Sequence, residues 1–234
     1  MSNIILLDKV PRSAVFTRSE HFEARNTAHG RRRHIQLCFK RLLDIVISAV
    51  ALLLLAPLLA LVAMAVRLDG PGPIFFVQTR FGRHLRPIRV VKFRTMHVDR
   101  CDPSGRDQTV ENDPRVTRTG AWLRRHNIDE LPQLWNVLKG DMSLVGPRCH
   151  AIGMLAAGRP YEELVPRYHE RHGMRPGMTG LAQVKGLRGR TADPALAARR
   201  IEQDIAYVER FSLLLDLRIL LVTLLREARG GTGI

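Results

Sequence analysis

The sequence predicts an α+β protein, predominantly helical, in which a re-entrant membrane helix-break-helix hairpin precedes a compact domain with short strands and interfacial amphipathic helices. Three features predict this arrangement. Residues 45–66 form an uncharged apolar run that a proline interrupts, residues 73–93 hold two short segments rich in β-branched and aromatic residues, and the second half of the chain holds several helical patterns. With 234 residues, the chain can form one domain with appendages.

Residues 1–36 are expected to form a mobile N-terminal extension. Their longest apolar stretch, residues 4–7, is far too short for the apolar region of a signal peptide. Three cysteines, Cys38, Cys101 and Cys149, contain no C-x-x-C pair, so the sequence supports neither a disulfide framework nor a structural zinc site. A reducing, cytoplasm-facing location fits this cysteine content.

The apolar run of residues 45–66 would measure roughly 33 Å as a helix, which matches the core of a bilayer. Pro57 lies near its middle, where it removes a backbone donor and favours a kink. Because basic residues cluster on both sides of the run, both of its ends are expected on the cytoplasmic side. A hairpin that breaks at Ala56-Pro57 satisfies both observations. A straight span or a buried helix of a soluble core fits them less well.

The segments that follow predict strands over residues 73–78 and 88–93, and a polar loop over residues 97–114. Helical patterns cover residues 121–125, 130–138, 161–172 and 194–210. Residues 211–225 are strongly apolar but contain Asp216 and Arg218, so they are expected to lie on a membrane surface rather than cross it. An ordinary core helix explains that last segment equally well.

The charge balance indicates a negatively charged partner. The chain holds 37 Lys and Arg against 22 Asp and Glu, a formal net charge of +15. Nucleic acid, anionic lipid and phosphorylated substrates all fit this charge. Neither a G-x-x-x-x-G-K-[ST] loop nor a strand-linked G-x-G-x-x-G fingerprint occurs, so the two usual glycine cradles for nucleotide phosphates are missing from the sequence.

The densest group of candidate catalytic residues surrounds Asp129 and Glu130, at the start of a predicted helix. Asn127 is expected to cap that helix, with Glu130 three residues later, and the positive helix end is expected to keep both acids ionised. An ionised Asp is a nucleophile without a base, but its attack on a diphosphate requires positive charge from a divalent cation or from arginines. Spacing alone favours a simpler interpretation, in which both acids merely cap the helix.

Seven motifs occur in one order along residues 40–183: KRLLD (40–44), QTRFG (78–82), KFRTM (92–96), DPRVTRTG (113–120), DELPQLWN (129–136), GDMSLVGPR (140–148) and RPGMTGLAQ (175–183). With them, the chain from about residue 40 to 223 resembles the bacterial sugar transferase family, the monotopic polyprenyl-phosphate phosphoglycosyl transferases of the small single-domain type. The resemblance implies domains of 1–36 (extension), 37–69 (re-entrant hairpin) and 70–234 (catalytic domain). It also implies a place in the inner membrane, with the catalytic domain facing the cytoplasm.

The resemblance implies a two-step transfer of sugar phosphate from a UDP-sugar to polyprenyl (undecaprenyl) phosphate, the first step of exopolysaccharide or related glycan assembly. In that family the acidic pair is catalytic, which implies that Asp129 forms a covalent phosphosugar intermediate and that Glu130 helps to hold Mg²⁺. The products would be polyprenyl-diphosphate-sugar and UMP. The sequence leaves the sugar open between glucose, galactose and an N-acetylated relative.

Five basic residues in or beside these motifs are expected to bind substrate phosphates, with lipid headgroup contacts or salt bridges as the alternative for each: Lys92, Arg94, Arg124, Arg148 and Arg175. Two positions depart from the family pattern. Cys149-His150 stands where a proline and often an acid are expected, which leaves details of donor binding open. His126-Asn127 replaces small hydroxylated residues.

The expected partners are the UDP-sugar, polyprenyl phosphate and membrane lipids, with no nucleic acid, and a homodimer is the expected assembly. His169 and His172 have an H-x-x-H spacing but no recognisable third ligand, so both are expected to be surface histidines. The alternative function is a non-catalytic, membrane-tethered polyanion-binding or scaffolding protein. That alternative leaves the cluster around Asp129 unexplained.

Overall fold

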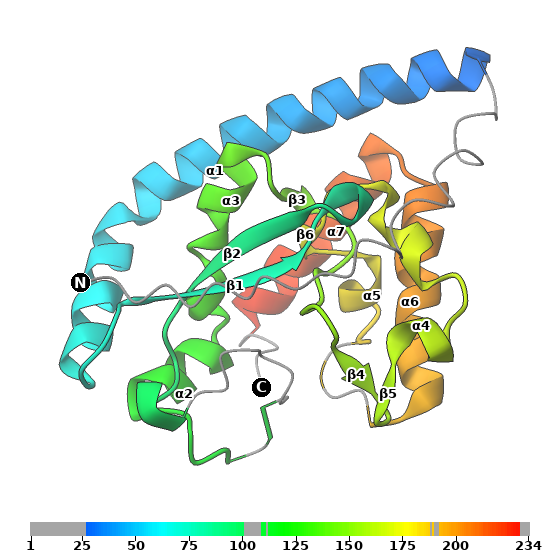
Figure 1. Cartoon of the computed structure of the whole chain (residues 1–234). Coiled ribbons are helices and arrows are strands. Elements are labelled where there is room, and N and C mark those ends of the chain that lie inside the picture. The colour runs from blue at the N-terminus through cyan, green and yellow to red at the C-terminus, as the bar shows by residue number, and fades with distance from the viewer. Residues whose placement is uncertain (1–26, 101–108, 111, 188, 190–191, 230–234) are drawn as a thin grey trace.

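The computed structural model describes residues 27–100, 109–110, 112–187, 189 and 192–229 (Figure 1). Within these residues the protein is mostly helical, and its strands form three two-stranded sheets. The predicted extension therefore falls largely outside the described residues, although its last part already belongs to the first helix. In chain order the main elements are α1 (Thr27–Leu68), β1 (Phe75–Phe81), β2 (Pro87–Phe93), α2 (Arg118–Arg125), α3 (Gln133–Lys139), β3 (Ser143–Val145), β4 (Leu155–Ala156), β5 (Arg159–Pro160), α4 (Tyr161–Leu164), β6 (Gly177–Thr179), α5 (Leu181–Val184), α6 (Pro194–Glu209) and α7 (Leu213–Ala228).

Helix α1 is a single helix of 42 residues that lies along one side of the molecule and turns toward its C-terminal end (Figure 1). The break predicted at Ala56-Pro57 is not observed, because the helix continues through Pro57. A proline removes one helical hydrogen bond, and a bend is enough to accommodate it. Among the described residues this is the one helix that is long and apolar enough to cross a membrane. Only 11% of its most apolar 18-residue stretch is buried inside the protein. That small share argues against the core helix of a soluble protein.

Strands β1 and β2 form an antiparallel hairpin in which Phe75 pairs with Phe93 and Phe81 pairs with Pro87. This confirms the two strands predicted from the β-branched and aromatic residues. The rings of Phe75 and Phe93 stack with centroids 5.4 Å apart. The hairpin lies beside α3 (Figure 1). The side-chain amide of Asn136 on α3 binds the edge of β2: its oxygen accepts from the Val91 N–H at 3.0 Å, and its nitrogen donates to the Arg89 carbonyl at 2.7 Å.

Strands β3 and β6 pair in parallel and bring two distant motifs together. The loop after β3 packs directly on β6, where the Gly146 N–H donates to the Thr179 carbonyl at 2.9 Å. A Cβ at Gly146 or at Gly177 would collide with the backbone of the other segment. Close approach of two backbones therefore explains Gly146, Gly177 and Gly180.

Of the later helices, α4 and α6 lie on the side of the molecule away from the end of α1, whereas α7 lies in the middle of the view (Figure 1). Helices predicted over residues 194–210 and 211–225 are confirmed as α6 and α7. The single helix predicted over residues 161–172 is wrong, because α4 ends at Leu164 and a separate 3-10 turn covers Tyr168–Gly173. Pro166 lies between the two and disfavours a helical conformation in the residue before it.

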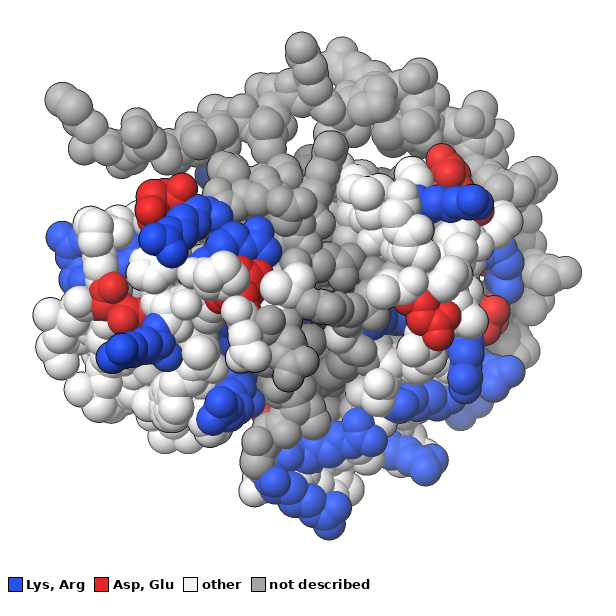
Figure 2. Space-filling view, turned by 90° about the horizontal axis from the view of Figure 1, so that it is seen from below, with Lys and Arg blue, Asp and Glu red and all other residues white. Residues whose placement is uncertain are grey.

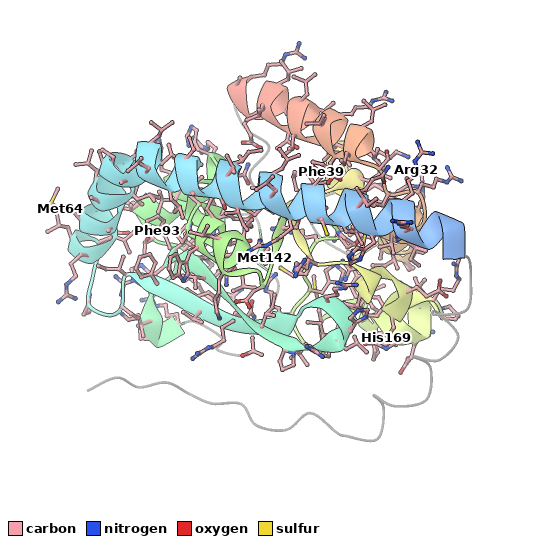
Figure 3. All side chains as sticks on the ribbon, turned by 90° about the horizontal axis from the view of Figure 1, so that it is seen from above. Arg32, Phe39, Met64, Phe93, Met142 and His169 are labelled. Atoms are coloured by element: carbon pink, nitrogen blue, oxygen red, sulfur yellow. The ribbon has the colours of Figure 1, made fainter. Side chains whose placement is uncertain are left out.

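Buried polar contacts join α1 to the rest of the protein. The Lys40 ammonium pairs with Asp216 of α7 at 2.6 Å and donates to the Val145 carbonyl at 2.9 Å. Tyr207 donates to the same Asp216 carboxylate at 2.7 Å. Asp44 is 3% exposed and accepts a hydrogen bond from the Leu144 N–H. The first part of α1 is thus an integral part of the folded domain. Seen from above in Figure 3, α1 lies over the side of the domain that holds Met142, while Met64 projects away from it.

Candidate active site

The acidic pair lies on a short 3-10 turn, Ile128–Glu130, between α2 and α3. Asn127 precedes the turn in the left-handed conformation (φ 53°, ψ 18°), and its side chain caps no helix. The predicted capping box is wrong, because the Asn127 side chain makes no capping hydrogen bond, and both acids lie in the 3-10 turn before α3, which begins only at Gln133. Electrostatic support for the pair therefore comes from neighbouring side chains rather than from a helix end.

Glu130 is held between two of the predicted cations. Its Oε1 accepts hydrogen bonds from Lys92 Nζ on β2 and from Arg148 Nη2 after β3, both at 2.6 Å. Arg148 Nη1 also reaches Oε2 at 3.2 Å. Burial alone would raise the pKa of Glu130, but Arg148 and Lys92 hold it well below its usual range. Glu130 is therefore ionised, and three distant segments meet at its carboxylate.

Asp129 is buried, with 8% of its surface exposed, and no described residue donates a hydrogen bond to its carboxylate. Burial raises the pKa of Asp129 above its usual value, and the charge of Glu130 adds to this effect. Lys92, Arg124 and Arg148 oppose it. A carboxylate with few hydrogen bonds and several nearby cations has the environment of a nucleophile that must approach an anionic substrate.

The structure places the other predicted phosphate-binding residues in different ways. Arg124 lies near the pair, and its guanidinium donates to the hydroxyls of Thr95 and Thr109 at 2.8 and 2.7 Å. Arg94 is not brought to the pair, since it donates to the carbonyls of Val66, Gly70 and Pro71 and thereby closes the end of α1. Arg175 is not brought there either. Its Nε donates to the Gly140 carbonyl at the end of α3, at 2.9 Å.

Arg148 is supported by a buried ion pair that the sequence analysis missed. Arg171 pairs with Asp204 of α6 at 2.7 Å, and their side chains are 1% and 2% exposed. The Arg171 guanidinium also donates to the Arg148 carbonyl, which fixes the main chain next to the cation that holds Glu130. The two partners lie 33 residues apart, so no local pattern links them in the sequence.

The unusual residues Cys149 and His150 are both buried. The Cys149 carbonyl accepts a hydrogen bond from Arg80 at 2.7 Å. His150 packs against the rings of Tyr161 and Tyr168, so it belongs to the core around α4 and α6. His172 is also buried, so its prediction as a surface histidine is wrong, whereas His169 is exposed as expected. Tertiary packing of the 3-10 turn, rather than the H-x-x-H spacing, decides their environment.

The donor atoms of the acidic pair fit a magnesium ion. Magnesium commonly takes one or two carboxylates together with substrate phosphates and water. The Oε2 of Glu130 accepts one longer hydrogen bond, and the Asp129 carboxylate accepts none from the described residues. Among the described residues no group of three or more His, Cys, Asp or Glu side chains gathers. Phosphates and water would therefore have to complete the ligand set.

The charged surface agrees with a polyanionic substrate. Figure 2 shows that Lys and Arg are more prominent than Asp and Glu on the face seen from below, where several of them gather along one edge. Cations on a surface concentrate phosphorylated ligands around a site and accelerate their association.

Comparison with known proteins identifies the family of the chain. Residues 35–230 match the family described as bacterial sugar transferase. The exopolysaccharide production protein PSS of Rhizobium leguminosarum bv. phaseoli is 59% identical over 199 residues, which cover 85% of this chain and 100% of that protein. An undecaprenyl-phosphate glucose phosphotransferase of Komagataeibacter xylinus is 47% identical over 188 residues, which cover 80% of this chain and 35% of that protein. A UDP-glucose:undecaprenyl-phosphate glucose-1-phosphate transferase of Caulobacter vibrioides is 50% identical over 186 residues, covering 79% and 67%.

These matches show an enzyme of the transferase class, and the chain belongs to the bacterial sugar transferase family. It spans about a third of the length of the Komagataeibacter relative and the whole of the Rhizobium relative.

Proposed function

We propose that the protein transfers a sugar phosphate from a UDP-sugar to undecaprenyl phosphate in the inner membrane, with the catalytic residues facing the cytoplasm. The observation that carries this proposal is the buried Asp129, next to a Glu130 clamped by Lys92 and Arg148. The names of the relatives support the choice of substrates.

In the first step, an oxygen of the Asp129 carboxylate attacks the phosphorus that carries the sugar. A bond forms between this oxygen and phosphorus, the bond from that phosphorus to the bridging oxygen breaks, and UMP leaves with the bridging oxygen and its electron pair. In the second step, a phosphate oxygen of undecaprenyl phosphate attacks the same phosphorus. The bond to Asp129 breaks, which frees the carboxylate and gives undecaprenyl-diphosphate-sugar.

The residues around Asp129 have separate roles in this proposal. Lys92, Arg124 and Arg148 offset the repulsion between the carboxylate and the donor diphosphate. Glu130 stays ionised and would hold Mg²⁺, which when bound would neutralise negative charge on the phosphate oxygens. Burial of Asp129 strengthens each of these electrostatic interactions, because little water screens them.

The arrangement of α1 and α7 supports a site at the lipid surface. Most of the apolar side chains of α1 are exposed, and α7 exposes a leucine face made of Leu214, Leu217, Leu221, Leu224 and Leu225. Both helices are seen on the face shown in Figure 3. We propose that α7 lies in the membrane interface and that the bent α1 enters the bilayer and returns to the cytoplasmic side. A lipid phosphate and a soluble nucleotide sugar can then meet at one site.

The proposal is tested with purified protein in vesicles that contain undecaprenyl phosphate, with Mg²⁺ and a panel of UDP-sugars. We expect UMP release with at least one donor, and complete loss of turnover in Asp129→Asn. Asp99→Asn, at an exposed carboxylate that pairs with Arg100, serves as the matched control and should retain activity. Intact-mass analysis with donor alone should show an added sugar phosphate on the wild type. Equal UMP release by the wild type and Asp129→Asn would refute the role of Asp129.

A further inference from the structure

The orientation of Asp129 depends on one backbone turn. Asn127 forms the junction between α2 and this turn, since its N–H donates to the Arg124 carbonyl at 3.1 Å and its carbonyl accepts from the Glu130 N–H at 3.3 Å. Asn is among the few residues other than glycine that adopt the left-handed conformation found here. Because no described residue holds the Asp129 carboxylate by a hydrogen bond, the direction of its side chain follows from this turn.

The side chain of Asn127 is held by a residue from the far end of the chain. Its Nδ2 donates to both carboxylate oxygens of Glu227, at 3.0 and 3.2 Å, across a separation of 100 residues. Glu227 belongs to the last turn of α7, and both side chains are half-buried. Hydrogen bonds to an ionised acceptor are stronger than those between neutral groups. The contact therefore fastens the catalytic turn to the end of α7.

We propose that Asn127 and Glu227 form a positioning pair that sets the approach of Asp129 to the donor phosphorus. The inference rests on the proposed function, because it assigns the nucleophile to Asp129. It also gives α7 a second role. The helix that exposes the leucine face also holds the turn of the nucleophile through Glu227. The proposal therefore links the depth of α7 in the membrane interface to the orientation of Asp129.

The test swaps the hydrogen-bond donor and acceptor between positions 127 and 227. Asn127→Asp keeps the size of the side chain and its tolerance of positive φ, but places two carboxylates against each other. We expect kcat to fall about tenfold, which corresponds to about 1.4 kcal/mol, while KM for the donor changes less than twofold. Glu227→Gln keeps an acceptor without its charge and should lower kcat about threefold. The double variant Asn127→Asp, Glu227→Gln restores a donor opposite a carboxylate and should return kcat to the level of Glu227→Gln.

Amide hydrogen exchange over residues 127–131 gives a readout that is independent of turnover. Exchange should rise in Asn127→Asp and return toward the wild-type rate in the double variant, with the thermal midpoint of unfolding shifted by less than about 4 °C throughout. Glu202→Gln, an exposed acid on α6, is the matched control. Unchanged exchange in Asn127→Asp, or a double variant no better than Asn127→Asp, would overturn the positioning pair. If the wild type released no UMP, the proposed function would be refuted. The hydrogen-exchange result would still show whether Asn127 and Glu227 hold the turn.

Discussion

Removing the charge of Asp204 should destabilise the protein strongly and impair the active site. Arg171 and Asp204 are almost fully buried, so Asp204→Asn leaves a guanidinium charge inside the protein without its counter-ion. Breaking such a pair from one side costs about 3–5 kcal/mol. For a domain of this size, each kcal/mol shifts the thermal midpoint by about 2–4 °C, so we expect a decrease of about 6–20 °C. Scanning fluorimetry of detergent-solubilised protein measures this shift.

The matched control is Glu170→Gln, which removes an exposed ion pair with Arg167 whose side chains are 58% and 40% exposed. Exposed pairs contribute at most about 1 kcal/mol, so this variant should melt within a few degrees of the wild type. Because Arg171 also holds the Arg148 carbonyl, Asp204→Asn should lower UMP release even well below its melting temperature. A midpoint for Asp204→Asn equal to that of Glu170→Gln would refute the reasoning from burial.

Three further outcomes are expected. Lys92→Met should lower turnover about 10-fold to 100-fold in the UMP-release assay, because it removes one of the two cations that pair with Glu130. Burial lowers the pKa of His172 from its ordinary 6.5 to about 3. As the pH drops, His172 is therefore protonated in the unfolded chain before it is protonated in the folded protein, and the free energy of unfolding falls between pH about 6.5 and 3. In denaturant titrations His172→Phe should reduce this loss by up to about 1.4 kcal/mol per pH unit. Single cysteines placed before Lys40 and after Arg67, in a background in which Cys38, Cys101 and Cys149 are all replaced by Ser, should both react with a cytoplasmic thiol reagent, and labelling from opposite sides would refute the proposed return of α1 to the cytoplasmic side.

The sequence predicted which residues belong to the site better than which groups those residues contact. Lys92 and Arg148 were expected to bind substrate phosphates, with salt bridges as one alternative, and the structure pairs both with Glu130. Arg94 belongs to the same kind of motif, but it satisfies three carbonyls at the end of α1, and no local pattern shows where a helix end will lie in space. Residue type alone does not separate a phosphate-binding arginine from one that closes a helix.

Asn127 shows the same limit for local capping rules. Its spacing to Glu130 predicted a capping box, yet a carboxylate 100 residues away takes its side chain. The predicted break at Pro57 also relied on a local rule, whereas the structure accommodates the proline within one helix. By contrast, the hairpin of β1 and β2 and the helices α6 and α7 follow from composition and periodicity, because neighbouring residues determine those patterns.

The contacts of Lys40 and Asp44 have a practical consequence for protein production. A fragment that begins at residue 70 would leave the Leu144 N–H without its Asp44 acceptor and would remove the Lys40 ammonium, the buried counter-ion of Asp216. It would also remove apolar side chains that cover the largest cluster of buried residues. Deleting the hydrophobic N-terminal helix to gain solubility should therefore yield aggregates instead of a smaller enzyme. Purification schemes need a detergent or nanodisc that shields the exposed face of this helix. The buried face must stay packed against the rest of the domain.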